Sequence, residues 1–208
     1  MIELLTANTP NGKKISIMLE EIKFDYKVTK INILKDEQFK PGFKKLSPFG
    51  KTPVIIDHDK KISMFESGAI LIYLGEKSGK FYAKSERTII NQWLMGQMAY
   101  VGPMLGQHHQ FHHYNPGKSE FGEKRYFQIS ERIYKELDER LSQSKFLAGK
   151  DYTIADIATF PWIARHDWHD IGLKQFKNLT RWYEEISKRE AVQKGYDLLN
   201  QGEKIPKV

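Results

Sequence analysis

The order of apolar patterns in the N-terminal part of this 208-residue chain constrains its fold more than any other feature. A short apolar run, Ile2–Leu5, predicts a strand, and apolar residues at helical spacing over 15–22 predict a helix. Alternating apolar and polar residues over Tyr26–Ile33 predict a second strand. Two more apolar runs, 54–56 and 62–64, flank a polar turn and predict a hairpin, which a further helical pattern follows. The sequence therefore predicts an α/β domain built as β-α-β and then β-β-α.

The rest of the chain has the patterns of helices. A polar stretch, Ser78–Glu86, has the composition of a linker between domains. One apolar stripe through 126–141 predicts a single long helix, and residues 153–156 match a capping box at the start of another. We therefore expect two domains, a thioredoxin-like α/β domain at 1–79 and an all-helical domain at 87–208.

The chain contains no cysteine. This absence excludes structural disulfides, cysteine-bound zinc and any thiol nucleophile on the protein itself. It also excludes glutaredoxin-type chemistry, which needs a protein thiol. Any sulfur chemistry must therefore use a thiol that a ligand brings.

The formal net charge of +7 favours anionic ligands, but the basic residues form no cluster. Lysines alternate with acids in segments such as 20–23 and 135–140, as on a solvated surface, so we expect no nucleic-acid partner. No apolar run approaches the about 20 residues of a membrane-spanning helix, so we expect no membrane partner. The segment Met1–Leu5 lacks the basic region of a signal peptide, from which we expect a cytoplasmic location.

The segment Lys51-Thr52-Pro53-Val54 has the features of one half of a binding site for a small peptide-like anion. The residue before a proline is held extended, so Thr52 can offer its backbone N–H and C=O to an extended ligand, as the edge of a sheet does. A cis Thr52–Pro53 bond would expose those groups in a tight turn. Lys51 beside them would bind a carboxylate at one end of the ligand.

The segment Phe65-Glu66-Ser67-Gly68-Ala69-Ile70 has the features of the other half. Ser67 precedes an apolar helical run and is expected to cap that helix, whose free N–H groups and positive end would face a carboxylate. Glu66 is placed to bind an ammonium group. These groups would hold a ligand with an α-amino acid head, an extended middle and a carboxylate at the far end, and glutathione has that description.

The turn Thr9-Pro10-Asn11-Gly12 lies between the first strand and the first helix, where thioredoxin-like folds place their redox centre. Pro and Asn-Gly are ordinary turn residues, and the local sequence favours this plain interpretation. In the other interpretation, the Thr9 hydroxyl, the Asn11 amide and the helix N-terminus stabilise the thiolate of a ligand. Each unit by which the thiol pKa falls needs about 1.4 kcal/mol of such stabilisation.

Taken together, these segments resemble the soluble glutathione transferases over nearly the whole chain. The resemblance is to the bacterial nu class, glutathione-dependent disulfide-bond oxidoreductases related to the yeast prion-forming nitrogen regulator. Each segment alone is weakly diagnostic, whereas their order and spacing are specific. The resemblance rests on Thr9–Gly12, Gln38-Phe39, Ser47-Pro48, Lys51–Pro53, Phe65–Ile70 and Gly102–Gln107. It implies a thioredoxin-like domain followed by a helical domain, with glutathione as cosubstrate and no tightly bound cofactor.

The resemblance also assigns roles to residues that look like ordinary turn or surface residues. It implies that Thr9 and Asn11 face the glutathione sulfur, where other classes use Tyr or Ser. It implies that Lys51 and Gln38 bind the glycyl carboxylate. It places Arg125 across a dimer interface, against the γ-glutamyl end of glutathione bound by the other subunit. A homodimer with shared sites is therefore expected.

A histidine-rich run, Gln107–His113, permits a second interpretation. His108 and His112, and likewise His109 and His113, are four residues apart, a spacing at which two imidazoles on a helix can share a metal. No carboxylate or cysteine stands near them in the sequence, and zinc needs three or four ligands, so we predict no metal site. In the family this segment lines the second-substrate pocket, for which the candidate contacts are Met104, His108 and Phe111.

The resemblance predicts an enzyme that reduces a small disulfide or attacks an electrophile with glutathione, with weak peroxidase or conjugating activity as a secondary expectation. The alternative is a non-catalytic glutathione-binding regulatory protein; the yeast regulator carries a long polar extension, whereas this sequence begins at the first strand. A translation-factor interaction module is disfavoured because it needs no intact Glu66-Ser67 site. A zeta-class isomerase is disfavoured because its opening with serine and cysteine is missing.

Overall fold

The computed structural model describes all 208 residues, and packing divides them into two compact units. The first comprises Met1–Tyr82 with Arg189–Lys204, and the second comprises Ala83–Lys188 with Ile205–Val208. These units differ from the expected domain limits, 1–79 and 87–208, in the placement of residues 189–204. The domain limits themselves stay a prediction.

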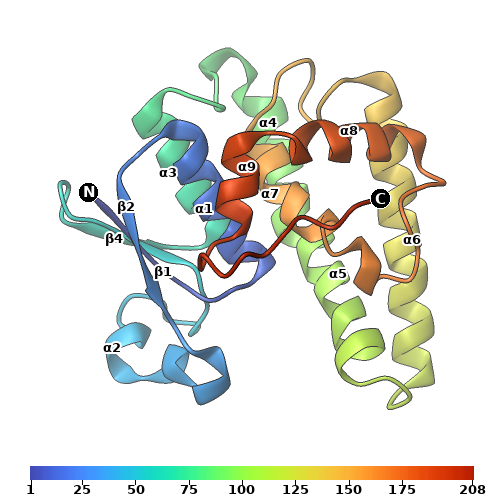
Figure 1. Ribbon diagram of the computed structural model, residues 1–208, viewed down its shortest axis with the longest axis horizontal. Helices are drawn as coiled ribbons and strands as arrows, with labels where there is room; N and C mark the ends of the chain where they lie inside the picture. Colours follow the sequence, from blue (N-terminus) through green and yellow to red (C-terminus); the bar gives the residue numbers. More distant parts are fainter. The chain divides into compact units, whose positions relative to one another are not determined.

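A four-stranded sheet lies in the first unit (Figure 1). Its strands are β1 (Ile2–Thr6), β2 (Tyr26–Lys30), β3 (Val54–Asp57) and β4 (Ile62–Phe65). The strand order is β2-β1-β3-β4, with β1 and β2 parallel and the other neighbours antiparallel. The predicted order of β-α-β and then β-β-α is confirmed.

The second strand is shorter than the alternating pattern predicts, because a tight turn replaces its end. The Asn32 backbone N–H donates to Glu37 Oε2 (2.8 Å), and the Asn32 side-chain oxygen accepts from Leu34 N–H (3.1 Å). Such side-chain bonds to the backbone compete with a strand ladder. Two 3-10 turns and one short helix follow: Ile33–Lys35, Glu37–Phe39 and α2 (Pro41–Lys44).

Three further helices belong to the first unit: α1 (Pro10–Ile22), α3 (Ser67–Ser78) and α9 (Glu190–Tyr196). Helices α1 and α9 lie side by side (Figure 1). Ser16 Oγ donates to the Gly195 carbonyl, and Lys13 Nζ donates to the Tyr196 carbonyl, both at 2.5 Å. A Cβ on Gly195 would lie 2.5 Å from Ile17 Cα, so glycine is needed at this approach. These contacts explain why α9 packs with the first unit although it follows the helical segment in the chain.

Helices make up the second unit: α4 (Arg87–Gly96), α5 (Gly102–His108), α6 (Glu120–Gln143), α7 (Ile154–Ile163) and α8 (Lys177–Ser187). Its shorter turns are the π-helical segments Gln97–Val101 and His109–Tyr114 and the 3-10 turns Lys84–Glu86 and His166–Trp168. The predicted long helix is α6, which begins after its N-cap, Ser119. None of the helices combines the length and apolar character that a membrane span requires.

Helix α7 is buried along its whole length. The predicted capping box is present at its start: Thr153 Oγ1 accepts from Ala155 N–H (3.3 Å), and Asp156 accepts from Thr153 N–H (3.0 Å). Asp156 also accepts from Leu147 N–H and from Trp182 Nε1, each at 2.9 Å. The box therefore also ties α7 to α8 and to the loop before it, which is a folding role.

Candidate functional site

The turn between β1 and α1 presents two polar side chains. Thr9 is the N-cap of α1, with its Oγ1 accepting from Gly12 N–H (3.2 Å), and Pro10 stands at the first helical position. Because a hydroxyl that accepts one hydrogen bond can still donate another, this cap does not consume the Thr9 proton. Asn11 follows, with its side chain half-buried. The turn is thus both the start of a helix and a group of donors at its positive end.

The loop before β3 contains a cis peptide bond between Thr52 and Pro53. Ser47 holds this loop, since its Oγ accepts from Lys51 N–H (3.1 Å) and donates to the Lys51 carbonyl (2.8 Å). Thr52 is half-buried, Pro53 is buried and the Lys51 side chain is exposed. The loop therefore presents a cation next to the backbone of Thr52.

Gln38 lies close to this loop, on the 3-10 turn Glu37–Phe39. Gly50 packs against the turn with φ of +62°, and an added Cβ there would lie 3.0 Å from the Gln38 carbonyl oxygen. The Gln38 side chain is buried; its Nε2 donates to the Ile33 carbonyl (3.4 Å), and its Oε1 has no hydrogen-bond partner. The structure thus brings Gln38 to the loop that carries Lys51, with one polar atom left unsatisfied.

Glu66 and Ser67 lie where β4 meets α3. The expectation that Ser67 caps α3 is wrong, because Glu66 is the N-cap and Ser67 is the first residue inside the helix. Glu66 has φ of +69°, and backbone strain of this kind costs about 1–3 kcal/mol and is concentrated at functional sites. The Glu66 side chain is exposed and Ser67 is buried. An exposed carboxylate therefore stands beside the N-terminal N–H groups of α3.

Lys14, a residue that none of the sequence motifs indicates, lies beside Ser67. Its side chain is buried, and its Nζ donates to Ser67 Oγ at 3.4 Å. Burial lowers the pKa of Lys14 well below its ordinary value, and the Glu66 carboxylate opposes this shift. Its burial is indicated only by its place in the sequence, since Lys14 directly precedes Ile15 in a helix whose residues are mostly buried. A lysine in such a place must be paired or neutral.

The remaining predicted site residues belong to the second unit. Arg125 is exposed on α6. On α5, Met104 is half-buried and His108 is fully buried. Phe111, in the π-helical segment after α5, stacks on Tyr126 with ring centroids 5.2 Å apart. These four predicted residues share the helical unit, whereas the others all lie in the first unit.

Part of the histidine run is buried inside the second unit. His109 Nε2 lies 2.8 Å from His169 Nε2, and His169 Nδ1 lies 2.7 Å from the Tyr134 hydroxyl. Burial lowers the pKa of His109 to about 3, with a smaller contribution from neighbouring His108. A carboxylate from a distant part of the chain also reaches the run, since Asp170 Oδ2 lies 3.7 Å from His112 Nδ1. Although no carboxylate is close to these histidines in the sequence, Asp170 is close to them in the folded structure, so this reason for predicting no metal site is wrong.

Comparison with known proteins covers both parts of the chain. The model of the glutathione S-transferase N-terminal domain matches residues 2–76, and that of the C-terminal domain matches residues 103–190. The disulfide-bond oxidoreductase YfcG of Escherichia coli K12 is 42% identical over 199 residues, which cover 92% of this chain and 93% of YfcG.

Solved structures agree with this comparison. A glutathione transferase from Burkholderia graminis, with two glutathione molecules bound per subunit, has a TM-score of 0.90 and 36% identity; the match covers 97% of this chain and 89% of the other. A glutathione transferase from Pseudomonas putida, with one glutathione disulfide bound per subunit, has a TM-score of 0.89 and 38% identity, with coverage of 95% and 91%. The predicted fold is confirmed, and the chain belongs to the glutathione S-transferase family.

Proposed function

We propose that this protein reduces disulfides with glutathione as its cosubstrate. The observation that carries the proposal is the turn at the start of α1, where Thr9 and Asn11 offer donors for a sulfur anion in a chain without cysteine. The comparisons support it. The E. coli relative is named a disulfide-bond oxidoreductase, and the Burkholderia and Pseudomonas structures hold glutathione or its disulfide.

In this proposal, glutathione binds in extended form along the loop before β3. The backbone of Thr52 pairs with the middle of the ligand, and Lys51 and Gln38 bind its glycyl carboxylate. Glu66 binds the α-ammonium group at the other end. Ser67 and the first N–H groups of α3 bind the α-carboxylate, since helix N-termini favour anions. The exposure of Lys51 and Glu66 supports these roles, because both charges are open to a ligand.

The nucleophile is the thiolate of bound glutathione. It attacks one sulfur of the substrate disulfide, so that a new S–S bond forms and the other substrate sulfur leaves as a thiolate. A second glutathione thiolate attacks the mixed disulfide, which releases glutathione disulfide and the second substrate thiolate. Thr9, Asn11 and the positive end of α1 lower the pKa of the glutathione thiol and so raise its thiolate fraction. The scheme requires two glutathione molecules, the number bound per subunit in the Burkholderia structure.

The finer assignments follow from the family resemblance and are part of the same proposal. The second substrate is a small disulfide or electrophile that contacts Met104, His108 and Phe111. The active form is a homodimer in which Arg125 of one subunit binds the γ-glutamyl end of glutathione in the other. Glutathione supplies the electrons, so no tightly bound cofactor is required. A cytoplasmic location suits this chemistry, because glutathione is kept reduced there.

Turnover of a small dialkyl disulfide with glutathione tests the proposal. Asn11→Ala is expected to lower the rate more than the glutathione affinity, because the amide acts on charge at sulfur. Asn8→Ala is the matched control, since Asn8 stands in the same turn but donates to Glu203 Oε2 (2.8 Å). Tight glutathione binding without turnover in the unmodified protein would instead support the alternative, a non-catalytic glutathione-binding regulatory protein.

A further inference from the structure

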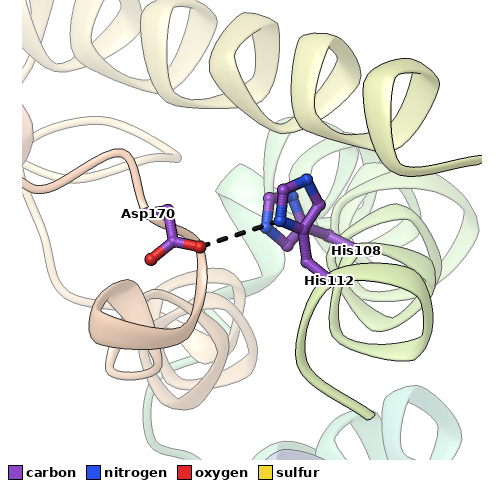
Figure 2. Close-up of side chains that lie close together, drawn as sticks. All are labelled: His108, His112 and Asp170. Atoms are coloured by element: carbon purple, nitrogen blue, oxygen red, sulfur yellow. Dashed lines mark ion pairs between the residues drawn. The ribbon is translucent and has the colours of Figure 1, made fainter. Parts of the chain in front are cut away.

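Three side chains with metal-ligating atoms converge in the second unit (Figure 2). His108 ends α5, His112 lies in the following π-helical segment, and Asp170 faces them from the loop after the 3-10 turn His166–Trp168. One ligating atom of each residue lies within 4.8 Å of those of the other two. The distance from His112 Nδ1 to Asp170 Oδ2 is 3.7 Å. The proposed chemistry at sulfur uses neither His112 nor Asp170.

One ring nitrogen of His108 has a hydrogen-bond partner and the other has none, as is common for a histidine that binds a metal. Its side chain is fully buried, and its Nδ1 lies 3.0 Å from Ser130 Oγ. Its Nε2 is buried and has no hydrogen-bond partner. Buried polar atoms are nearly always satisfied, so this nitrogen calls for a partner that the protein itself does not supply. Metal-binding histidines commonly donate their other ring N–H to a neighbouring acceptor, the role that Ser130 Oγ would have here.

The two histidines of the cluster lie face to face. The rings of His108 and His112 stack with centroids 4.5 Å apart. The stacking holds both imidazoles at the same end of the cluster, opposite the Asp170 carboxylate (Figure 2).

A surface groove gives access to the cluster. His112 lines a groove of about 410 Å³ that also contains Lys124 and three acidic residues, Glu120, Glu123 and Glu131. Acids outnumber the single lysine, so the groove attracts cations. His112 thus connects the buried nitrogen of His108 with solvent.

We propose that His108, His112 and Asp170 bind a divalent first-row transition metal, with Zn²⁺ as the representative ion. Imidazole ligands favour such metals over Mg²⁺ or Ca²⁺, which prefer oxygen. Two imidazoles and one carboxylate leave the fourth position of a tetrahedral zinc open, as in sites that keep a bound water. All three ligands belong to the second unit, whereas the proposed glutathione-binding residues other than Arg125 belong to the first. His108 is also a proposed contact of the second substrate, so zinc binding is measured directly rather than through turnover.

Binding requires the ligands to close on the ion. Zinc–imidazole bonds of about 2.0–2.1 Å place the ligand atoms of a tetrahedral site roughly 3.3 Å apart. Ligand atoms that lie up to 4.8 Å apart must therefore approach one another by as much as roughly 1.5 Å. Asp170 can provide much of this movement, because its side chain is 69% exposed. The His112 side chain, 24% exposed, also borders the groove.

Titration calorimetry of the metal-free, untagged protein with Zn²⁺ tests the site. One zinc ion per chain is expected to bind. His112→Ala and Asp170→Asn are each expected to weaken binding at least tenfold, since even the loss of a hydrogen-bond partner of a ligand commonly costs about 10–100-fold. Both side chains reach solvent, so both variants should fold. Zn²⁺ should raise the melting temperature of the unmodified protein but not of these variants.

His113→Ala is the matched control, because His113 belongs to the same run but stacks on Trp168 at 3.9 Å and is outside the cluster. It should bind zinc like the unmodified protein. Co²⁺ gives a second readout, in which the visible absorption of a low-symmetry site should appear in the unmodified protein and vanish in Asp170→Asn. The absence of saturable zinc binding, or equal binding by His112→Ala and Asp170→Asn, would overturn the proposal.

Discussion

Lys14 Nζ donates to Ser67 Oγ at 3.4 Å, and both side chains are buried, with exposures of 1% and 5%. This contact orients the Ser67 hydroxyl. It places Lys14 Nζ against the hydroxyl that is proposed to bind the α-carboxylate of the ligand. The contact therefore connects a lysine hidden in α1 to the γ-glutamyl end of the proposed glutathione site.

Replacing Ser67 with alanine should weaken glutathione binding by about 1.5–3 kcal/mol, because the hydroxyl bonds a charged group. Ser67 does not cap α3, so the helix should persist. Ser78→Ala is a suitable control, since Ser78 ends the same helix and donates to the Leu74 carbonyl (2.7 Å). Calorimetry with glutathione measures the difference. Equal affinity of folded Ser67→Ala and the unmodified protein would remove Ser67 from the site.

Arg125→Ala should weaken the binding of glutathione disulfide and leave the fold intact. The reason is that Arg125 is exposed on α6 and is proposed to reach the site of the other subunit. Lys124→Ala removes a neighbouring exposed charge from the same helix and should leave binding unchanged. Light scattering at the assay concentration should show a dimer. A fully active monomer would show that the sites are not shared.

Asp57 should stabilise the first unit at pH values above the pKa of an aspartate in the unfolded chain, which is about 3.9. Burial alone would raise the pKa of Asp57, but hydrogen bonds from Lys77 and Tyr73 of α3 outweigh it and hold the pKa well below its ordinary range. A depressed carboxyl pKa means that the unfolded chain takes up a proton first as the pH falls. The stabilisation is therefore complete at neutral pH and is lost progressively below about pH 4.

Asp57→Asn tests this dependence. It should lower the free energy of unfolding at pH 7 by about 1–3 kcal/mol, since Lys77 loses a charged partner. The difference from the unmodified protein should shrink as the pH falls from 5 to 3. Asp59→Asn, in the exposed turn of the same hairpin, serves as the control. Urea unfolding at several pH values gives these numbers, and a difference that stays constant with pH would contradict the assignment.

Local patterns in the sequence suffice for most of the fold. Short apolar runs and one alternating pattern locate the four strands, and an apolar stripe at helical spacing locates the long α6. The capping box at Thr153 and Asp156 is present as predicted. The packing of α9 on α1, by contrast, does not follow from any apolar pattern in the sequence. It depends on Lys13, Ser16 and Gly195, three residues that carry no hydrophobic signal.

The candidate site is predictable only in part, because local patterns do not show which residues distant in the sequence meet in the fold. Short motifs locate Thr9, Thr52 and Glu66, because turn and proline chemistry act within a few residues. The burial of Lys14 and the approach of Asp170 to His112 arise from tertiary packing, which no local motif encodes. Thus, the neighbours of a residue in the sequence can indicate that it belongs to a binding site, but they do not indicate which distant residues it will contact.

The proposed disulfide reduction uses the thiol of glutathione and no thiol of the protein, which has no cysteine. A shift of the thiol pKa from near 9 to near 7 would raise the thiolate fraction about fifty-fold at neutral pH, with part of the gain lost because a less basic thiolate is a poorer nucleophile.

The most direct test is the rate at which glutathione reduces a small dialkyl disulfide, measured with protein that has been treated with a thiol alkylator and then freed of it. Turnover well above the uncatalysed rate is expected, equal before and after the treatment, because the chain has no cysteine to alkylate. Turnover no faster than the uncatalysed rate, or activity that alkylation abolishes, would contradict it.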